Sequence, residues 1–219
     1  MIFVNFKTFE GGTGTKAISL IKTIEEVAYL SGVKIIPAVQ ASDVKEAVAS
    51  SKLEIWTQNI DPVTYGAHTG SILPEAVFED GASGTFLNHS EAKMGDFEKL
   101  KVSVQRAGEV GLKTLVFASD ARELAQIVTL KPTFASYEPP ELIGSRETSV
   151  AQAHPDIISE ASEICKNAAV PLIVGAGVHS REDVKKSLEL GAVGVALATD
   201  VVTALDPRAE LMDLVEGFK

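Results

Sequence analysis

The stretch that decides the fold is VPLIVGAGVHSREDVKKSLELGAVGVALA, residues 170–198. It opens with the apolar run Val170–Gly175 and closes with the apolar run Val193–Ala198, and both runs are short and rich in β-branched residues. Between them, Ser180 suits the position just before a helix, and apolar residues follow it at helical spacing. Two strands joined by one helix predict a parallel β/α/β unit.

The same alternation extends back over the rest of the chain. Six further β-rich runs come before this unit, and helical patterns separate them: Ile2–Phe6, Val33–Val39, Leu53–Asn59, Gly84–Asn88, Lys113–Ala118 and Thr133–Glu138. Eight such units close a barrel, so we predict an α/β protein of the (β/α)8 barrel class, one domain over residues 1–219. An open doubly wound sheet is disfavoured because the glycines of residues 11–14 lack the GxGxxG spacing. The chain is shorter than the roughly 250 residues usual for this barrel, so we expect trimmed helices in its middle.

Composition argues against several other classes of protein. No apolar run approaches the roughly 20 residues of a membrane span, and the N-terminus lacks the pattern of a secretory signal. We therefore expect a cytoplasmic protein without a membrane partner. The net charge of −10 and the absence of a basic stripe argue against nucleic acid. The single cysteine, Cys165, lies among apolar residues at helical spacing, so we predict a buried helix residue and not a nucleophile.

Polar residues and glycines follow six of the predicted strands. In a barrel the carboxyl ends of the strands meet at one rim, which is where active sites lie. The residues that reach this rim are Asn5, Lys7, Gln58, Asn59, Asp61, Asn88, His89, Glu91, Glu138, Gly175, Gly177, Thr199 and Asp200. Because the chain is acidic overall, an anionic ligand would have to be attracted by local groups such as a lysine and backbone N–H groups.

Three motifs at this rim resemble the triosephosphate isomerase family. They are NFK at residues 5–7, LNHSE at residues 87–91 and YEPPELIGS at residues 137–145. Each is weak alone, but together they occupy the correct strand ends, and the last motif and the short length resemble the archaeal branch. The resemblance implies a cofactor-free and metal-free isomerase of glycolysis and gluconeogenesis. Such an enzyme interconverts dihydroxyacetone phosphate and D-glyceraldehyde 3-phosphate through an enediolate.

The resemblance implies a role for each motif residue. Glu138 would be the proton acceptor, and His89 the neutral electrophile that polarises the carbonyl. Lys7 and Asn5 would bind substrate, with Glu91 near the lysine. Without the motifs, each of these residues would be interpreted as an ordinary polar residue of the barrel rim.

The phosphate site is implied by position in the same motifs. The implied contacts are Ile143 and Gly144 in a lid over residues 139–146, and Gly177, Ala198 and Thr199 in the turns after the last two strands. Those turns would need glycine even without a ligand. The histidines show no metal-ligand spacing, so no metal is expected. We assign structural roles to the three outside the motifs, His68, His154 and His179.

The sequence departs from the family pattern in several places. Arg146 stands where the lid usually ends in glycine, and residues 174–177 replace a Tyr-Gly-Gly-Ser latch. Asp200 follows the turn that usually carries Gly-Gly, and we expect its side chain to point away from the phosphate. The loop Tyr65–Gly70 matches the family segment that enters a neighbouring subunit, so Thr69 is expected to contact a partner in a homodimer or homotetramer.

Two other functions remain to be weighed. A different phosphosugar barrel would share the phosphate turns, but an aldolase needs a Schiff-base lysine on the sixth strand, where Ser136, Tyr137 and Glu138 stand instead. A barrel that only binds a phosphate ligand, without turnover, would have the same fold. Turnover of the triose phosphates separates this alternative from the isomerase.

Overall fold

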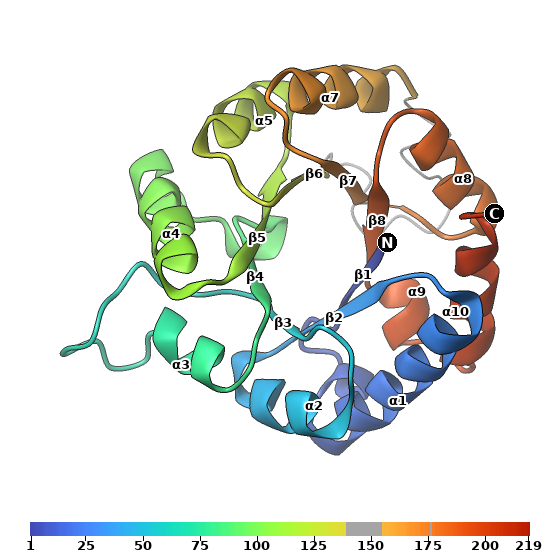
Figure 1. Ribbon diagram of the computed structural model, residues 1–219, viewed down its shortest axis with the longest axis horizontal. Helices are drawn as coiled ribbons and strands as arrows, with labels where there is room; N and C mark the ends of the chain where they lie inside the picture. Colours follow the sequence, from blue (N-terminus) through green and yellow to red (C-terminus); the bar gives the residue numbers. More distant parts are fainter. Residues whose placement is uncertain (139–154, 176) are drawn as a thin grey trace.

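The computed structural model describes residues 1–138, 155–175 and 177–219. Eight parallel strands form a closed barrel in chain order, with helices around the outside (Figure 1). The strands are β1 (Ile2–Asn5), β2 (Ile35–Val39), β3 (Trp56–Thr57), β4 (Gly84–Leu87), β5 (Lys113–Ala118), β6 (Phe134–Tyr137), β7 (Leu172–Gly175) and β8 (Gly194–Leu197). Each lies within one of the eight predicted runs, so the (β/α)8 barrel is confirmed.

Short helices account for the short chain. The described helices are α1 (Gly14–Ser31), α2 (Val44–Ser50), α3 (Pro74–Glu79), α4 (Phe97–Val110), α5 (Ala121–Ile127), α7 (Pro155–Asn167), α8 (Arg181–Glu189), α9 (Thr199–Val202) and α10 (Pro207–Glu216). Four single 3-10 turns join them: η1 (Glu10–Gly12), η2 (Ala41–Asp43), η3 (Ser90–Ala92) and η4 (Val128–Leu130). Helices α2, α3 and α5 have only seven, six and seven residues. The predicted trimming in the middle of the chain is therefore confirmed.

Local sequence signals set several helix ends. Ser180 caps α8, and its hydroxyl accepts a hydrogen bond from the N–H of Asp183 within a capping box. Gly32 ends α1 with φ of 70°, a left-handed conformation that glycine adopts at little cost. Pro207 opens α10, where its missing N–H leaves no helical hydrogen bond unmade. Helices α9 and α10 are consequently separate pieces.

Two apolar layers hold the barrel. The inner layer consists of Phe3, Ile36, Ala38, Trp56, Phe86, Leu115, Phe117, Ile173 and Ala196. Its rings pack edge to face, as in the pair Phe3 and Trp56 with centroids 5.0 Å apart. Gly84 is required beside this layer, because a Cβ atom there would overlap the Trp56 indole. The outer layer joins strands to helices and includes Cys165, whose predicted position as a buried helix residue is confirmed in α7.

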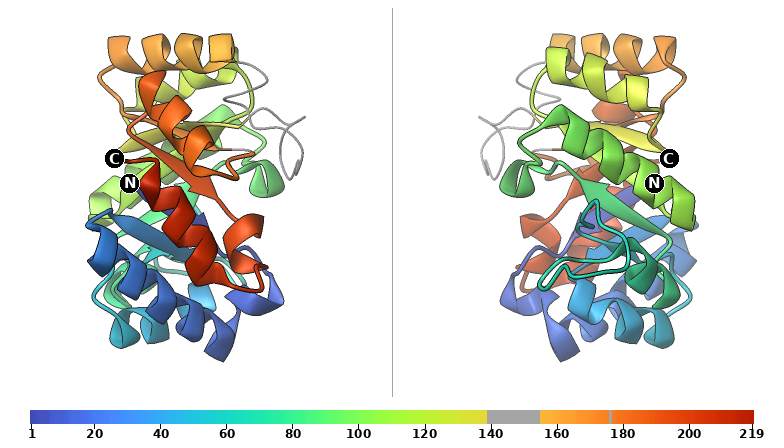
Figure 2. Two further views of the ribbon diagram at one scale, coloured as in Figure 1. Left: turned by 90° about the vertical axis from the view of Figure 1, so that its right-hand side faces the viewer. Right: turned by 90° about the vertical axis from the view of Figure 1, so that its left-hand side faces the viewer.

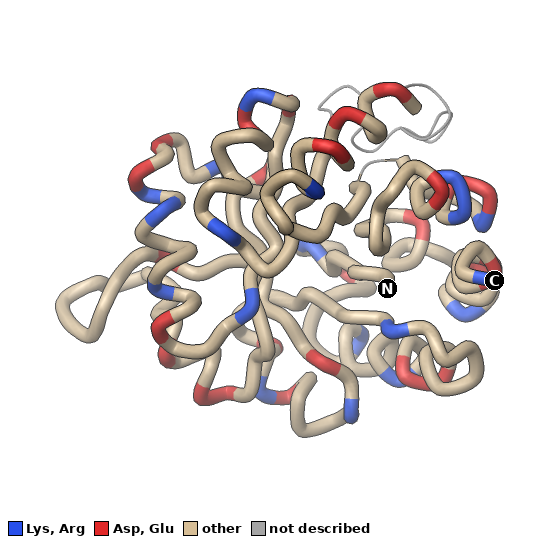
Figure 3. Tube along the Cα trace, turned by 45° about the horizontal axis from the view of Figure 1, so that its top comes forward, with Lys and Arg blue, Asp and Glu red and all other residues tan. Residues whose placement is uncertain are grey.

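The barrel has two distinct ends. The chain termini lie at one end, and η3 and α9 lie at the opposite end, where the strands finish (Figure 2). Basic and acidic residues are interspersed over the outer helices (Figure 3). Among the described residues, no helix is long and apolar enough to cross a membrane.

Candidate active site

The segment after β1 holds Lys7 in a fixed backbone conformation. Lys7 has φ of 46°, an uncommon value for a residue with a side chain. Its N–H donates to Asn5 Oδ1 at 3.0 Å, and its carbonyl accepts from Gln58 Nε2 at 2.9 Å. The Lys7 ammonium lies 2.7 Å from Glu91 Oε1, and its side chain is 17% exposed. Asn5, Lys7 and Glu91 therefore lie close together, and Gln58 is an additional support.

His89 follows β4 and begins the η3 turn. Its Nδ1 accepts a hydrogen bond from the N–H of Glu91 at 3.2 Å, and its ring packs edge-on against Phe117 with centroids 5.0 Å apart. An Nδ1 that accepts carries no proton, so the ring proton of neutral His89 resides on Nε2.

The surroundings of His89 favour this neutral form. Burial lowers the pKa of His89 to about 4. The charge of Glu91 opposes this shift, whereas Lys7 and Lys93 reinforce it. At pH 7 the ring is therefore neutral, and its Nε2–H can donate to a ligand.

Glu138 follows β6 and directs its carboxylate toward this ring. Its Oε2 lies 3.6 Å from His89 Nε2 and has no hydrogen-bond partner among the described residues. Burial raises the pKa of Glu138 to about 7, although the positive charge of Lys7 acts in the opposite direction. Such a carboxylate can take up a proton near neutral pH.

Gly175, at the end of β7, makes room for that carboxylate. A Cβ atom at this position would overlap Glu138 Oε1 and crowd the Glu138 Cγ. The sequence places Gly175 at the rim without indicating this role. The available signal was a glycine at the end of a buried strand, where another chain segment often approaches closely.

The predicted phosphate contacts are only partly described. Gly177 follows β7 with φ of 65°, and Ala198 and Thr199 follow β8. Strand β8 pairs with both β7 and β1, so these turns neighbour the strand that leads to Asn5 and Lys7. Ile143, Gly144, Arg146 and the rest of the predicted lid lie outside the described residues, as does His154. The phosphate contacts stay predictions.

Asp200 has a partner that the sequence did not reveal. Its Oδ2 lies 2.8 Å from His179 Nδ1, and both side chains are partly buried. The backbone N–H of His179 donates to Asp183 Oδ2 at 3.1 Å, which anchors the histidine to the start of α8. The structural role predicted for His179 thus includes binding the unusual acid.

These side chains form one chemical unit. A buried base, a neutral hydrogen-bond donor and an ammonium group lie at the ends of β6, β4 and β1. Within the described part of the chain, no three His, Cys, Asp or Glu residues gather closely enough to hold a metal ion. Proton transfer next to a carbonyl requires only the three groups that are present.

Comparison with known proteins agrees with this arrangement. The sequence model of the family described as triosephosphate isomerase matches residues 1–217. The chain belongs to the triosephosphate isomerase family. Members of this family are isomerases that interconvert dihydroxyacetone phosphate and glyceraldehyde 3-phosphate.

Several relatives that are named triosephosphate isomerase come from archaea. The triosephosphate isomerase of Methanobacterium bryantii is 38% identical over 217 residues, which cover 98% of this chain and 95% of that protein. The enzyme of Methanothermus fervidus is 39% identical, with 98% and 97% covered. The enzyme of Metallosphaera sedula is 37% identical, with 99% and 95% covered. These identities extend the family resemblance over the whole chain.

A solved structure shows the same fold. The crystal structure of triosephosphate isomerase from Bartonella henselae superimposes with a TM-score of 0.74 and covers 98% of this chain and 95% of its own. Its sequence is only 16% identical, so this likeness supports the barrel architecture alone.

Proposed function

We propose that this chain interconverts dihydroxyacetone phosphate and D-glyceraldehyde 3-phosphate, with Glu138 as the base and His89 as the electrophile. The observation that supports this most strongly is Glu138 Oε2, which has no hydrogen-bond partner in the described part of the chain and faces the protonated nitrogen of a neutral imidazole at 3.6 Å. Each group has its pKa displaced in the direction that its role requires. The proposal includes a role in glycolysis and gluconeogenesis and a cytoplasmic location.

The reaction moves one proton between two carbons. Glu138 removes a proton from C1 of dihydroxyacetone phosphate, and the C–H electron pair forms a double bond between C1 and C2. The carbonyl oxygen becomes an enediolate oxygen, which the Nε2–H of His89 stabilises and protonates. His89 recovers a proton from the other oxygen, and Glu138 returns its proton to C2. Atoms and electrons balance without a redox cofactor.

Lys7 supplies the positive charge of the site in this proposal. The enediolate and the phosphate are both anionic, and preorganised positive charge is often the largest contribution to catalysis. Asn5 fixes the Lys7 backbone through the 3.0 Å hydrogen bond, and it would also contact substrate. Glu91 pairs with the Lys7 ammonium and therefore restricts its position.

We assign phosphate binding to the turns after β7 and β8. Gly177, Ala198 and Thr199 would donate backbone N–H groups, and Ile143 and Gly144 would contribute from the lid. The left-handed conformation of Gly177 supports this, because such turns direct successive N–H groups toward an anion.

We further propose that the chain forms a homodimer or homotetramer through the loop that contains Thr69. Residues 64–71 are all exposed, and Tyr65 is 69% exposed. This loop, between β3 and α3, extends away from the barrel (Figure 1). Light scattering of the purified protein should give a mass of two or four chains. Thr69→Arg should shift it toward one chain, and a monomeric parent protein would contradict the proposal.

The activity is tested by isomerisation of glyceraldehyde 3-phosphate in buffer with a metal chelator. We expect rapid turnover by the parent protein and a loss of about 100-fold or more in Glu138→Asp, because the shorter side chain withdraws the base by about 1 Å. Glu98→Asp, an exposed glutamate of α4, is the matched control and should keep parent activity. A folded but inactive parent protein would contradict the proposal and favour a barrel that only binds phosphate.

A further inference from the structure

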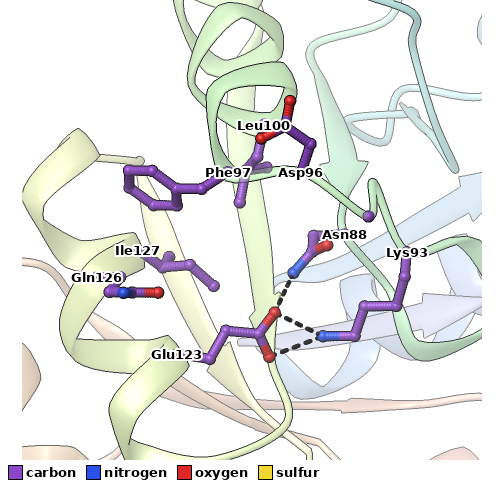
Figure 4. Close-up of a pocket in the computed structure, with 9 residues that line it drawn as sticks. Asn88, Lys93, Asp96, Phe97, Leu100, Glu123, Gln126 and Ile127 are labelled. Atoms are coloured by element: carbon purple, nitrogen blue, oxygen red, sulfur yellow. Dashed lines mark hydrogen bonds and ion pairs between the residues drawn. The ribbon is translucent and has the colours of Figure 1, made fainter.

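A hydrogen-bonded cluster lies immediately behind the His89 turn. Glu123, on α5, accepts from Asn88 Nδ2 at 2.7 Å and from the Ser119 N–H at 2.7 Å. Lys93 Nζ approaches both oxygens of the same carboxylate, at 2.8 and 2.7 Å. Figure 4 shows Asn88 and Lys93 converging on the Glu123 carboxylate. One side chain thus connects the ends of β4 and β5 with the segment after η3.

Asn88 is the residue that connects this cluster to His89. It directly precedes His89 and has φ of 60°, a left-handed conformation that costs free energy unless its surroundings hold it. Its Oδ1 accepts from the Met94 N–H at 3.1 Å, and its Nδ2 donates to the Phe117 carbonyl at 2.9 Å as well as to Glu123. The segment that contains His89 is therefore closed into a loop and anchored on β5.

The charges of the cluster also affect the pKa values of the active-site residues. Burial alone would raise the pKa of Glu123, but Lys93, Ser119 and Asn88 outweigh it and hold that pKa below its usual range. Glu123 is therefore ionised at neutral pH and fixes the position of the Lys93 ammonium. Lys93 is one of the charges that lower the pKa of both His89 and Glu138.

We propose that Glu123 is a positioning residue for the isomerisation, holding the His89 imidazole in line with Glu138 through Asn88 and Lys93. This inference rests on the proposed function. A carboxylate is suited to the task because its two oxygens accept from three separate segments at once. The cluster borders a cavity of about 350 Å³ between α4 and α5, lined also by Phe97 and Ile127.

The experiment compares Glu123→Ala and Glu123→Gln with Glu98→Gln. Glu98 pairs with Lys101 on the exposed surface of α4 and serves as the matched control. We expect Glu123→Ala to lower kcat about 10- to 100-fold with KM changed less than about threefold, as for other groups that orient a catalytic side chain. Glu123→Gln keeps an acceptor for Asn88 and should lose less. The control should match the parent.

A double-mutant cycle tests whether Glu123 acts on His89 through Asn88. If Glu123 acts through Asn88, then the Asn88→Ala/Glu123→Ala double variant should lose little more kcat than the worse single variant. Fully additive losses would show that Glu123 does not act through Asn88 and would overturn the inference that this hydrogen bond positions His89.

The ring itself gives a readout that does not depend on turnover. In ¹⁵N spectra, the parent His89 should show an unprotonated Nδ1 and a protonated Nε2, assigned with the help of His89→Gln. Glu123→Ala should shift or broaden these signals, and the control should not. Unchanged signals and kcat, with only thermal stability reduced, would show a merely structural role and overturn the inference. If the parent protein lacked activity, the proposed function would fail, while these spectra would still decide the role of Glu123.

Discussion

His89 Nε2 lies 3.6 Å from Glu138 Oε2, while Nδ1 of the same ring accepts from the backbone of Glu91. This relationship separates the roles of the two residues. The backbone hydrogen bond determines which nitrogen carries the proton, and burial keeps the ring neutral and the carboxylate basic. A hydrogen-bond donor and a base therefore face the same space without forming an ion pair.

Stability should depend on the ionisation of Glu138. Its pKa is about 7 in the folded protein against a usual 4.5, so the folded protein holds a proton that the unfolded chain releases. The free energy of unfolding therefore falls by roughly 3 kcal/mol in total through this group as pH rises from about 4.5 to 7. Glu138→Gln cannot titrate, so its free energy of unfolding should rise relative to the parent over this interval.

Urea denaturation of both proteins at pH 5 and pH 8 measures this difference. Burying the amide of Glu138→Gln has a free-energy cost that does not depend on pH. This cost cancels when the difference in unfolding free energy between variant and parent is compared at the two pH values. A difference between variant and parent that stays the same at both pH values would show that the carboxylate is not held in a raised-pKa environment.

The pH dependence of kcat/KM should show an acid-side limb from Glu138. The rate constant should rise through about pH 7 as Glu138 loses its proton. The phosphate of the substrate titrates at about pH 6 in every variant, but His89 itself should add no limb between pH 5 and 6.5, because its pKa is about 4. Steady-state rates from pH 5 to 9 test this. A limb near pH 6.5 that disappears in His89→Gln would mean that the ring titrates normally.

Gly175→Ala should impair catalysis by displacing the base. The added methyl group overlaps Glu138 Oε1, so the carboxylate must move away from His89. We expect kcat/KM to fall by about 100-fold or more, because small displacements of reacting groups are costly. Gly108→Ala is the matched control, since a Cβ atom there meets nothing within 4 Å. Parent-like activity in Gly175→Ala would mean that Glu138 tolerates another position.

The Asp200–His179 pair should protect phosphate binding. His179→Ala removes the partner that lies 2.8 Å from Asp200 and frees a negative charge beside the proposed phosphate turn. Repulsion of about 1 kcal/mol would weaken binding of inorganic phosphate, measured as competitive inhibition, by about fivefold. The Asp200→Ala/His179→Ala double variant should recover parent affinity. If the double variant stayed weak, His179 would itself be a phosphate contact.

Sequence alone predicted those features that depend on local pattern. The eight runs gave the strands in order because alternating apolar strands and amphipathic helices are visible along the chain. Boundaries were less accurate: within the predicted strand Leu53–Asn59, only Trp56 and Thr57 form the strand β3. Beyond it, the Gln58 N–H still donates to the Val39 carbonyl, while the Gln58 side chain donates to the Lys7 carbonyl.

Features that depend on distant neighbours could not be read from pattern. The space that Gly175 leaves for Glu138 depends on two neighbouring strands. The pair of Asp200 and His179 joins helix α9 to the loop before α8, 21 residues away in the chain. The bonds of Glu123 likewise depend on how α5 packs beside η3. The motifs indicated the residues of the site, and only the structure showed the contacts between them.

The transfer of deuterium from solvent tests the central claim most directly. Dihydroxyacetone phosphate is incubated in D2O with the parent protein or with Glu138→Gln, and proton NMR follows C1 of dihydroxyacetone phosphate and C2 of glyceraldehyde 3-phosphate. A proton on Glu138 can exchange with solvent before it is returned to carbon, so the parent should place deuterium on C2 of the product and, through the reverse step, on C1 of the substrate. Glu138→Gln should place almost none, and deuterium incorporation by this variant at the parent rate would contradict the account.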